Sequence, residues 1–229
     1  MEKTKKITWI GNSILGVVLI GLFLLNLIPN FYLDISFQIV VYIGLAILTF
    51  IGMKLQLRKT GDEEKEKVRR RNITRIFVIY CFFLISILLF SGSVRMYTRG
   101  DDGLGLFSEE HFAYYSNFIP FHTIGSYFQR MVEQSINLSI PIMNLLGNLV
   151  LFLPMGFFLP YLWKEKFGKF PWFVLSIIGI VVLVEFIQFV TLKGQADIDD
   201  VILNTLGAMI GFGFFRIPMI QKAMKWILR

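Results

Sequence analysis

The residues of this chain that could do chemistry gather in its last third, within stretches that are otherwise almost purely apolar. Glu185 and Gln188 are three residues apart in one apolar run, and Asp200 and Asn204 are four apart at the start of the next. Ionisable side chains inside apolar spans are costly to keep, so they are candidates for a functional site. Glu185 and Asp200 could act as general acid and base, hold a divalent cation together with Asp197, or bind a polar ligand.

Each of these carboxylates also has a purely structural interpretation. Asp199 and Asp200 begin an apolar run, where they could cap the free N–H groups of their own helix and interact with its dipole. This explanation fits Asp199 better than Asp200, because Asn204 lies on the same helical face as Asp200. Glu185 has no capping role to explain it, although it could be a protonated, neutral side chain bonded to a nearby amide.

The elements that position these residues are predicted to be membrane-spanning helices. Hydrophobic residues make up 55% of the 229 residues and charged residues only 17%, against about 25% charged in a soluble domain. Several apolar runs reach the roughly 20 residues needed to cross a bilayer core. We therefore predict an all-α, polytopic transmembrane helical bundle of about six spans, at residues 7–27, 36–53, 75–94, 138–162, 171–192 and 201–217. The first run is expected to be a retained helix and not a signal peptide, because it lacks a small-x-small cleavage site.

The basic residues predict the orientation of these spans. If both termini are cytoplasmic, 19 of the 23 Lys and Arg residues lie on the inner side, as expected in a cytoplasmic membrane. The net charge of +7 then needs no nucleic-acid partner. Residues 54–75 are expected to be a solvated cytoplasmic loop, whose Arg69, Arg70 and Arg71 could alternatively contact anionic lipid.

The spans suggest three units along the chain. Residues 1–75 would hold two N-terminal helices and the basic loop, residues 76–217 a four-helix core, and residues 218–229 a short basic amphipathic helix on the inner membrane surface. The core contains an outer loop at residues 98–137, which is rich in aromatic residues and long enough to be a binding loop. Residues 127–136 of that loop could form an amphipathic helix on the outer leaflet.

The polar residues of three spans are predicted to meet. Asn144 and Asn148 would lie roughly 9 and 15 Å below the outer end of the fourth span, at 1.5 Å per residue. The pairs in the fifth and sixth spans would also lie in the outer half of the membrane, with Asp200 at the mouth of its span. The simplest arrangement turns the three polar faces toward a cavity that opens to the outside.

Glycines at positions 147, 156, 207 and 211 are expected to let helices approach closely. Pro154 should bend the fourth span, and Cys81, the one cysteine, is expected to be a small buried side chain.

Five short motifs in this order resemble the VanZ-like family of bacterial membrane proteins. The resemblance covers about residues 95–211. The motifs are Asn117-Phe118-Ile119-Pro120-Phe121, Asn148 followed by Phe152-x-Pro154-x-Gly156, Glu185-x-x-Gln188, Gly194 followed by Asp197-x-x-Asp200, and Asn204-x-x-Gly207-x-x-x-Gly211.

The resemblance implies a role in the bacterial envelope, in low-level resistance to the lipoglycopeptide teicoplanin, and no particular reaction. The family usually has an Arg after the glycine of the last outer turn, where this chain has Gln195. If that Arg binds an anionic group in relatives, this chain would use Arg95, Arg99 or Lys193, or would bind something less charged.

Three functions stay open from the sequence. The first is a noncatalytic protein whose outer cavity accepts a lipid-linked wall precursor or the acyl tail of a lipoglycopeptide, besides its contacts with membrane lipids. The second is an enzyme acting on a polyprenyl-phosphate or similar headgroup, with Glu185 and Asp200 as acid and base or as ligands of a divalent cation. The third is a proton-coupled transporter that uses Glu185 as a relay, which the lack of a clear inverted repeat disfavours.

Overall fold

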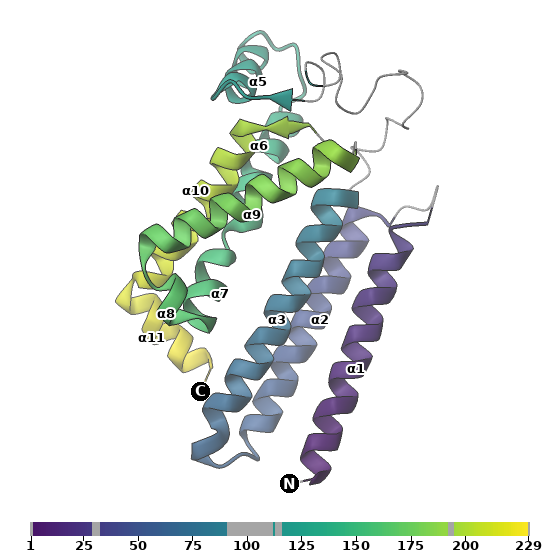
Figure 1. The fold of residues 1–229 in the computed structure, drawn as a ribbon, viewed down its shortest axis with the longest axis vertical. Helices are drawn as coiled ribbons and strands as arrows, with labels where there is room; N and C mark the ends of the chain where they lie inside the picture. Colours follow the sequence, from purple (N-terminus) through teal and green to yellow (C-terminus); the bar gives the residue numbers. More distant parts are fainter. Residues whose placement is uncertain (1, 29–32, 91–111, 113–115, 192–194, 229) are drawn as a thin grey trace.

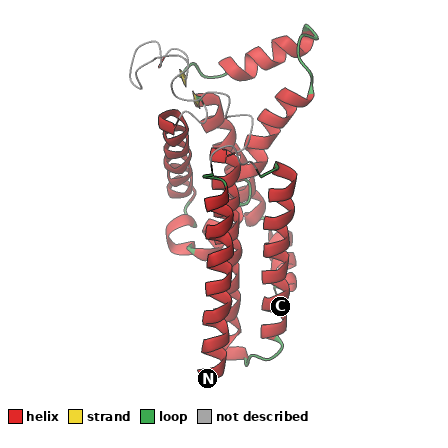
Figure 2. Cartoon of the chain, turned by 90° about the vertical axis from the view of Figure 1, so that its right-hand side faces the viewer, coloured by secondary structure: helices red, strands yellow, loops and turns green. Residues whose placement is uncertain are grey.

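The part of the chain that the structure describes is almost entirely helical (Figure 2). The structure is a computed structural model, and it describes residues 2–28, 33–90, 112, 116–191 and 195–228. The helices are α1 (Glu2–Leu25), α2 (Ile35–Leu57), α3 (Asp62–Phe90), α5 (His122–Val132), α6 (Ser139–Phe152), α7 (Met155–Leu162), α8 (Lys164–Phe167), α9 (Phe170–Thr191), α10 (Ile198–Arg216) and α11 (Pro218–Ile227). Two short strands, β1 (Ser116–Asn117) and β2 (Ala196–Asp197), pair in parallel.

The predicted all-α helical bundle is confirmed. Five helical segments in the described residues are long and apolar enough to cross a membrane: Ile35–Leu57, Asp62–Leu89, Ser139–Leu162, Phe170–Thr191 and Ile198–Arg216. They correspond to the second to sixth predicted spans. The first predicted span lies almost wholly within the 24-residue helix α1.

The prediction of a solvated loop over residues 54–75 was wrong. Helix α2 continues to Leu57 and α3 begins at Asp62, so that only four residues connect them. The acidic residues at the start of α3 interact favourably with the helix dipole. Val68 and Ile73 of α3 are buried against Met53 and Leu57 of α2. The charges therefore cover the exposed face of an amphipathic helix, which dense charge in a sequence does not distinguish from a loop.

The helices form two groups, with α1, α2 and α3 side by side in one group and α6, α7, α9 and α10 in the other (Figure 1). The core of the second group contains Phe173, Ile177 and Val181 of α9 and Ala208 and Phe212 of α10. Side chains of α3, α6 and α7 complete it: Leu84, Phe152, Met155 and Leu159. Helix α10 contacts α6, α7 and α9 and is thus the centre of this group.

Small residues allow α10 to lie against the fourth predicted span, which is divided at Pro154 into α6 and α7 as the proline predicted. A Cβ atom on Gly207 would overlap with the carbonyl oxygen of Leu149, and one on Gly211 with that of Leu153. Gly156 is equally close to the backbone of α10. The packing role predicted for Gly147 was wrong, because nothing lies within 4 Å of its Cβ position.

Both ends of the chain lie at one end of the bundle, and α5 with the strand pair lies at the other (Figure 1). This agrees with the prediction that the two termini share one side and the outer loop the opposite side, as far as residues 116–137 of that loop describe it. Which side faces the cytoplasm stays a prediction. The candidate polar residues lie at the α5 end.

Candidate functional site

The site is built around the turn between α9 and α10. Strand β2 of this turn pairs with β1, so that Ser116 lies opposite Ala196 and Asn117 opposite Asp197. The pairing ties the segment before α5 to the start of α10. Asp197 has an extended backbone and is the N-cap of α10, where its Oδ1 accepts a hydrogen bond of 2.9 Å from the N–H of Asp199.

The carboxylate of Asp197 is fully used by the protein. Besides the cap, Oδ1 accepts a bond of 3.0 Å from the side-chain amide of Asn117, and Oδ2 accepts one of 2.5 Å from the hydroxyl of Thr123. Asp197 is also buried. Its predicted role as a ligand-binding residue stays a prediction, but its contacts are those of a structural clamp between α10 and α5.

Asp199 has a role that the sequence did not reveal. It was expected to cap its own helix, but its buried carboxylate accepts bonds from the N–H groups of Phe121, at 2.5 Å, and Ile124, at 3.0 Å. Phe121 is the N-cap of α5, with φ of 64°, and has no side-chain oxygen to cap that helix. Asp199 therefore supplies the cap from α10. One signal in the sequence was the absence of Ser, Thr, Asp or Asn directly before His122.

Glu185 lies inside the bundle, one and a half turns before the end of α9. Its side chain is 6% exposed, and Oε2 accepts a bond of 3.2 Å from the N–H of Asp197. The bond holds Glu185 against β2. Glu185 thus reaches the α9–α10 turn from inside the bundle, as its depth in the sequence predicted.

Asp200 connects α10 to α6. Its Oδ1 accepts a hydrogen bond from the side-chain amide of Asn148. The polar residues of α6, α9 and α10 therefore meet: Asn148 binds Asp200, and Glu185 binds the backbone of Asp197. The catalytic or binding roles of these four residues stay predictions, and the structure supplies the juxtaposition that those roles need.

Asn204 is one turn deeper in α10 than Asp200 and is 2% exposed. Its Oδ1 has no hydrogen-bond partner among the described residues. A buried amide oxygen left unpaired costs about 1–3 kcal/mol. The unpaired oxygen adds a hydrogen-bond acceptor to the buried part of the cluster.

Two of the predicted site residues that the structure describes are not joined to this cluster. Gln188 donates its amide to the carbonyl of Leu88 at 2.9 Å and so connects α9 to α3. Asn144 is exposed and donates to the hydroxyl of Tyr127 and to the carbonyl of Ile140, each at 3.1 Å. Arg95 lies outside the described residues, as do Arg99 and Lys193.

Tyr127 of α5 is a polar group beside the site that the sequence analysis treated only as part of an amphipathic helix. Its hydroxyl accepts the bond from Asn144. Burial, together with the negative charges of Asp200 and Asp197, raises the pKa of the Tyr127 hydroxyl above its usual value. Tyr127 therefore stays protonated at neutral pH and offers an O–H donor at the edge of the cluster.

The described residues contain no group of three or more His, Cys, Asp or Glu side chains arranged to hold a metal ion. The contacts give one reason, since Asp197 and Asp199 are occupied by protein donors. The divalent cation considered from the sequence has no such group to support it in this part of the chain.

The cavity predicted at the outer end stays a prediction. Two pockets lie elsewhere in the structure. One of about 280 Å³ is lined by α1, α2 and α3, from Gly11 to Arg75. The other, of about 940 Å³, lies at the end of the bundle that holds α11.

The polar cluster lies within the segment of the chain that matches a known protein family. The model of a family described as VanZ/LLP1 matches residues 77–220, more than half of the chain. Protein VanZ of Enterococcus faecium is 32% identical over 88 residues, which are 37% of this chain and 53% of that protein. The chain thus spans about half the length of this curated relative. No solved structure matches.

Proposed function

This chain belongs to the VanZ/LLP1 family, and on that premise we propose that it is a bacterial cell-envelope protein that lowers susceptibility to lipoglycopeptides such as teicoplanin. It does so by binding an amphiphilic ligand at the α5 end of the bundle. The ligand is a lipid-linked wall precursor or the lipoglycopeptide itself. Helices long and apolar enough to span a membrane support the location.

The observation that carries this proposal is an apolar turn fixed directly beside the polar cluster. Phe118 and Phe121 are 65% and 62% exposed, although they lie in a turn that hydrogen bonds hold in place. Ile119 and Phe128 are exposed nearby. Large apolar side chains gathered at one exposed place often mark a binding surface. An amphiphile would place its apolar part on this turn and its polar part on the cluster.

The chemistry of the cluster indicates which part of a ligand it would bind. Glu185 and Asp200 are acidic, and the amides of Asn148 and Asn204 add further oxygens. The oxygens of Asp197 are already bonded within the protein. Carboxylates repel phosphate and accept bonds from hydroxyl, amide and ammonium groups. The sugar and peptide groups of a wall precursor or a lipoglycopeptide supply such donors. Gln195 stands where the resemblance to the family leads us to expect Arg, and a neutral side chain there suits a less anionic ligand group.

A second candidate is an enzyme that acts on a lipid-linked envelope precursor. One observation favours it. Among the described residues, Glu185 and Asp200 each accept a single protein hydrogen bond, whereas Asp197 accepts three and Asp199 two. Glu185 and Asp200 thus keep an oxygen for a substrate proton, as a general acid and base require.

Expression in a teicoplanin-sensitive bacterial host tests the proposal. The minimal inhibitory concentration is measured for teicoplanin and for a glycopeptide that has no acyl chain. Protection against teicoplanin alone would indicate that the acyl tail is bound, and equal protection against both would indicate a wall precursor. No protection against either, with the protein present in the membrane, would refute the proposed function.

A further inference from the structure

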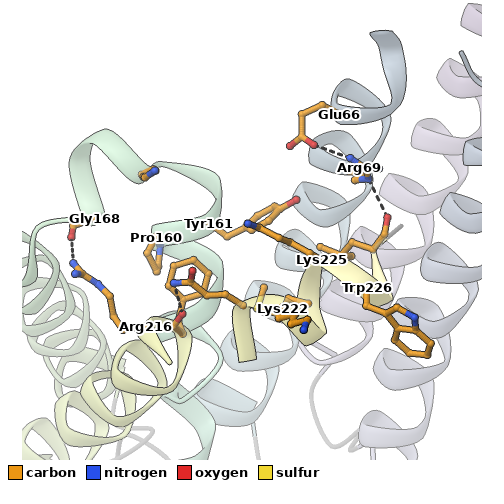
Figure 3. A pocket seen from close by; sticks show the side chains of 14 residues that line it. Glu66, Arg69, Pro160, Tyr161, Gly168, Arg216, Lys222, Lys225 and Trp226 are labelled. Atoms are coloured by element: carbon orange, nitrogen blue, oxygen red, sulfur yellow. Dashed lines mark hydrogen bonds and ion pairs between the residues drawn. The ribbon is translucent and has the colours of Figure 1, made fainter. Parts of the chain in front are cut away.

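A second site lies at the end of the bundle opposite the polar cluster. Here a pocket of about 940 Å³ opens between α3, the α7–α8 segment and the α10–α11 segment (Figure 3). Five basic side chains line it: Arg69, Lys164, Arg216, Lys222 and Lys225. Glu66 is the one acidic residue of this lining. The excess of positive charge favours an anionic ligand.

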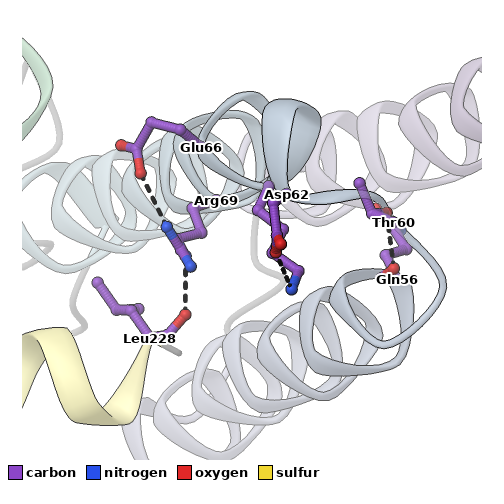
Figure 4. A network of polar contacts seen from close by, with 7 residues as sticks. Gln56, Thr60, Asp62, Glu66, Arg69 and Leu228 are labelled. Atoms are coloured by element: carbon purple, nitrogen blue, oxygen red, sulfur yellow. Dashed lines mark hydrogen bonds and ion pairs between the residues drawn. The ribbon is translucent and has the colours of Figure 1, made fainter.

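The wall formed by α11 is held in place by cations from the other helix group. The Arg69 Nε of α3 donates to the carbonyl of Leu228 at 2.9 Å, and the Lys54 Nζ of α2 donates to that of Ile227 at 2.9 Å (Figure 4 shows the Arg69 contacts). Basic groups at a helix C-terminus satisfy its last carbonyls and interact favourably with its dipole. The tail is a helix, as predicted. The two hydrogen bonds dock its C-terminal end on α2 and α3.

The arginines of this region are already engaged. Arg69 also pairs with Glu66 at 3.0 Å, Arg70 donates to the carbonyl of Leu162 at 2.8 Å, and Arg71 donates to the Gln56 side chain at 3.1 Å. The lipid contact considered for these three arginines from the sequence thus competes with bonds inside the protein.

The lysines of the pocket are different. Lys164, Lys222 and Lys225 are exposed and have no acidic partner among the described residues. Lys222 and Lys225 are three residues apart on α11, so they lie on one face of the helix. They are the cations with capacity for a ligand.

The pocket also has an apolar wall. Pro160 and Tyr161 of α7, Phe215 of α10, and Met224 and Trp226 of α11 line it beside the lysines. It lies where two spans end, since α7 ends at Leu162 and α10 at Arg216. Trp226 is 76% exposed, as suits a side chain in the headgroup region of a bilayer. A free phosphate ion would contact only the lysines. A phospholipid would contact the lysines with its headgroup and the apolar wall with its acyl chains.

We propose that this pocket binds the phosphodiester headgroup of an anionic membrane phospholipid. Lys222 and Lys225 contact the headgroup from α11, Lys164 contacts it from α8, and the acyl chains follow the apolar wall. Basic pockets between membrane helices are known to hold such headgroups. Lys222 and Lys225 follow the end of the family match at residue 220, and Arg69 precedes its start at residue 77. The lipid site therefore depends on segments outside the matched family segment.

Native mass spectrometry of the purified full chain tests this assignment. The protein is mixed in detergent with phosphatidylglycerol or with phosphatidylcholine of the same acyl chains. The detergent is then removed in the mass spectrometer, and the lipid that stays bound is measured. We expect preferential retention of phosphatidylglycerol. The variant Lys222→Gln/Lys225→Gln should bind it about thirtyfold more weakly, since each basic residue near an anionic lipid contributes about fivefold. The matched control, Arg58→Gln/Lys59→Gln, removes two exposed charges in the α2–α3 connection outside the pocket and should bind like the wild type.

Several results would overturn the proposal. Equal retention of the two lipids would show that the pocket does not select a charge. An equal loss in both double variants would assign the effect to general surface charge. Thermal stabilisation by inorganic phosphate that matches stabilisation by phosphatidylglycerol would assign the pocket to soluble phosphate. Thermal unfolding without lipid controls for folding, and it should be unchanged because both lysines are exposed.

Discussion

The carboxylate of Asp199 accepts a hydrogen bond of 2.5 Å from the backbone N–H of Phe121, which is 78 residues earlier in the chain. The first residues of a membrane helix thereby fix the start of α5 and the exposed apolar turn before it. This bond and the one from Ile124 join the turn directly to the start of α10.

Replacement of this carboxylate should release α5. In Asp199→Asn, one of the two oxygens that accept the N–H groups of Phe121 and Ile124 becomes an NH₂ group and leaves a donor unpaired. The cost is about 1–3 kcal/mol, so we expect roughly 10- to 100-fold faster hydrogen exchange at these two amides. Asp34→Asn is the control, because Asp34 caps α2 and Asn caps as well as Asp. Unchanged exchange in Asp199→Asn would show that the bonds do not hold the turn.

The two carboxylates of the cluster should be needed for protection against teicoplanin. Glu185→Gln and Asp200→Asn keep the shape of the side chains and remove the charge and the exchangeable proton, so we expect loss of protection with normal membrane levels on an immunoblot. Glu133→Gln, on the exposed end of α5, should retain it. Full protection in both amide variants would exclude the enzymatic function and leave the binding function.

Two glycines offer a matched test of helix packing. Gly207→Ala should destabilise the protein, because the new methyl group would overlap with the Leu149 carbonyl, and overpacking typically costs about 1–3 kcal/mol. Gly147→Ala should be neutral or stabilising by up to about 1 kcal/mol, since its Cβ meets nothing within 4 Å. Thermal unfolding in detergent measures both. Equal stability of the two variants would contradict the close approach of α10 and α6.

The orientation in the membrane can be tested with single cysteines in a Cys81→Ser background. Lys67 and Glu133 are both exposed. Lys67 is near the start of α3 and Glu133 directly follows α5, and α3 starts at the end of the bundle opposite α5 (Figure 1). An impermeant maleimide should label Glu133→Cys in intact cells and reach Lys67→Cys only after lysis. The opposite pattern would invert the predicted topology.

The sequence by itself determined the membrane architecture and the location of the polar groups. A span of about 20 apolar residues is a local property, so five of the predicted spans correspond to helical segments of the structure. The break at Pro154 is also local, because proline removes a backbone donor wherever it occurs in a helix. The depth of Glu185, Asp200 and Asn148 in their spans followed from counting residues, and this was enough to predict that they meet.

The tertiary structure alone decided which partner each polar group takes. Gln188 was predicted to lie on the same helical face as Glu185. Residues three apart in an α-helix point in directions that differ by about 60° around the helix axis. That rotation is enough for Gln188 to meet Leu88 of α3. Asp197 and Asp199 are two residues apart, and only the position of α5 shows that Asp197 caps α10 while Asp199 caps α5. The basic pocket likewise requires α11 to dock on α2 and α3. These outcomes depend on how distant helices are placed and rotated against one another, which the local pattern of residues does not encode.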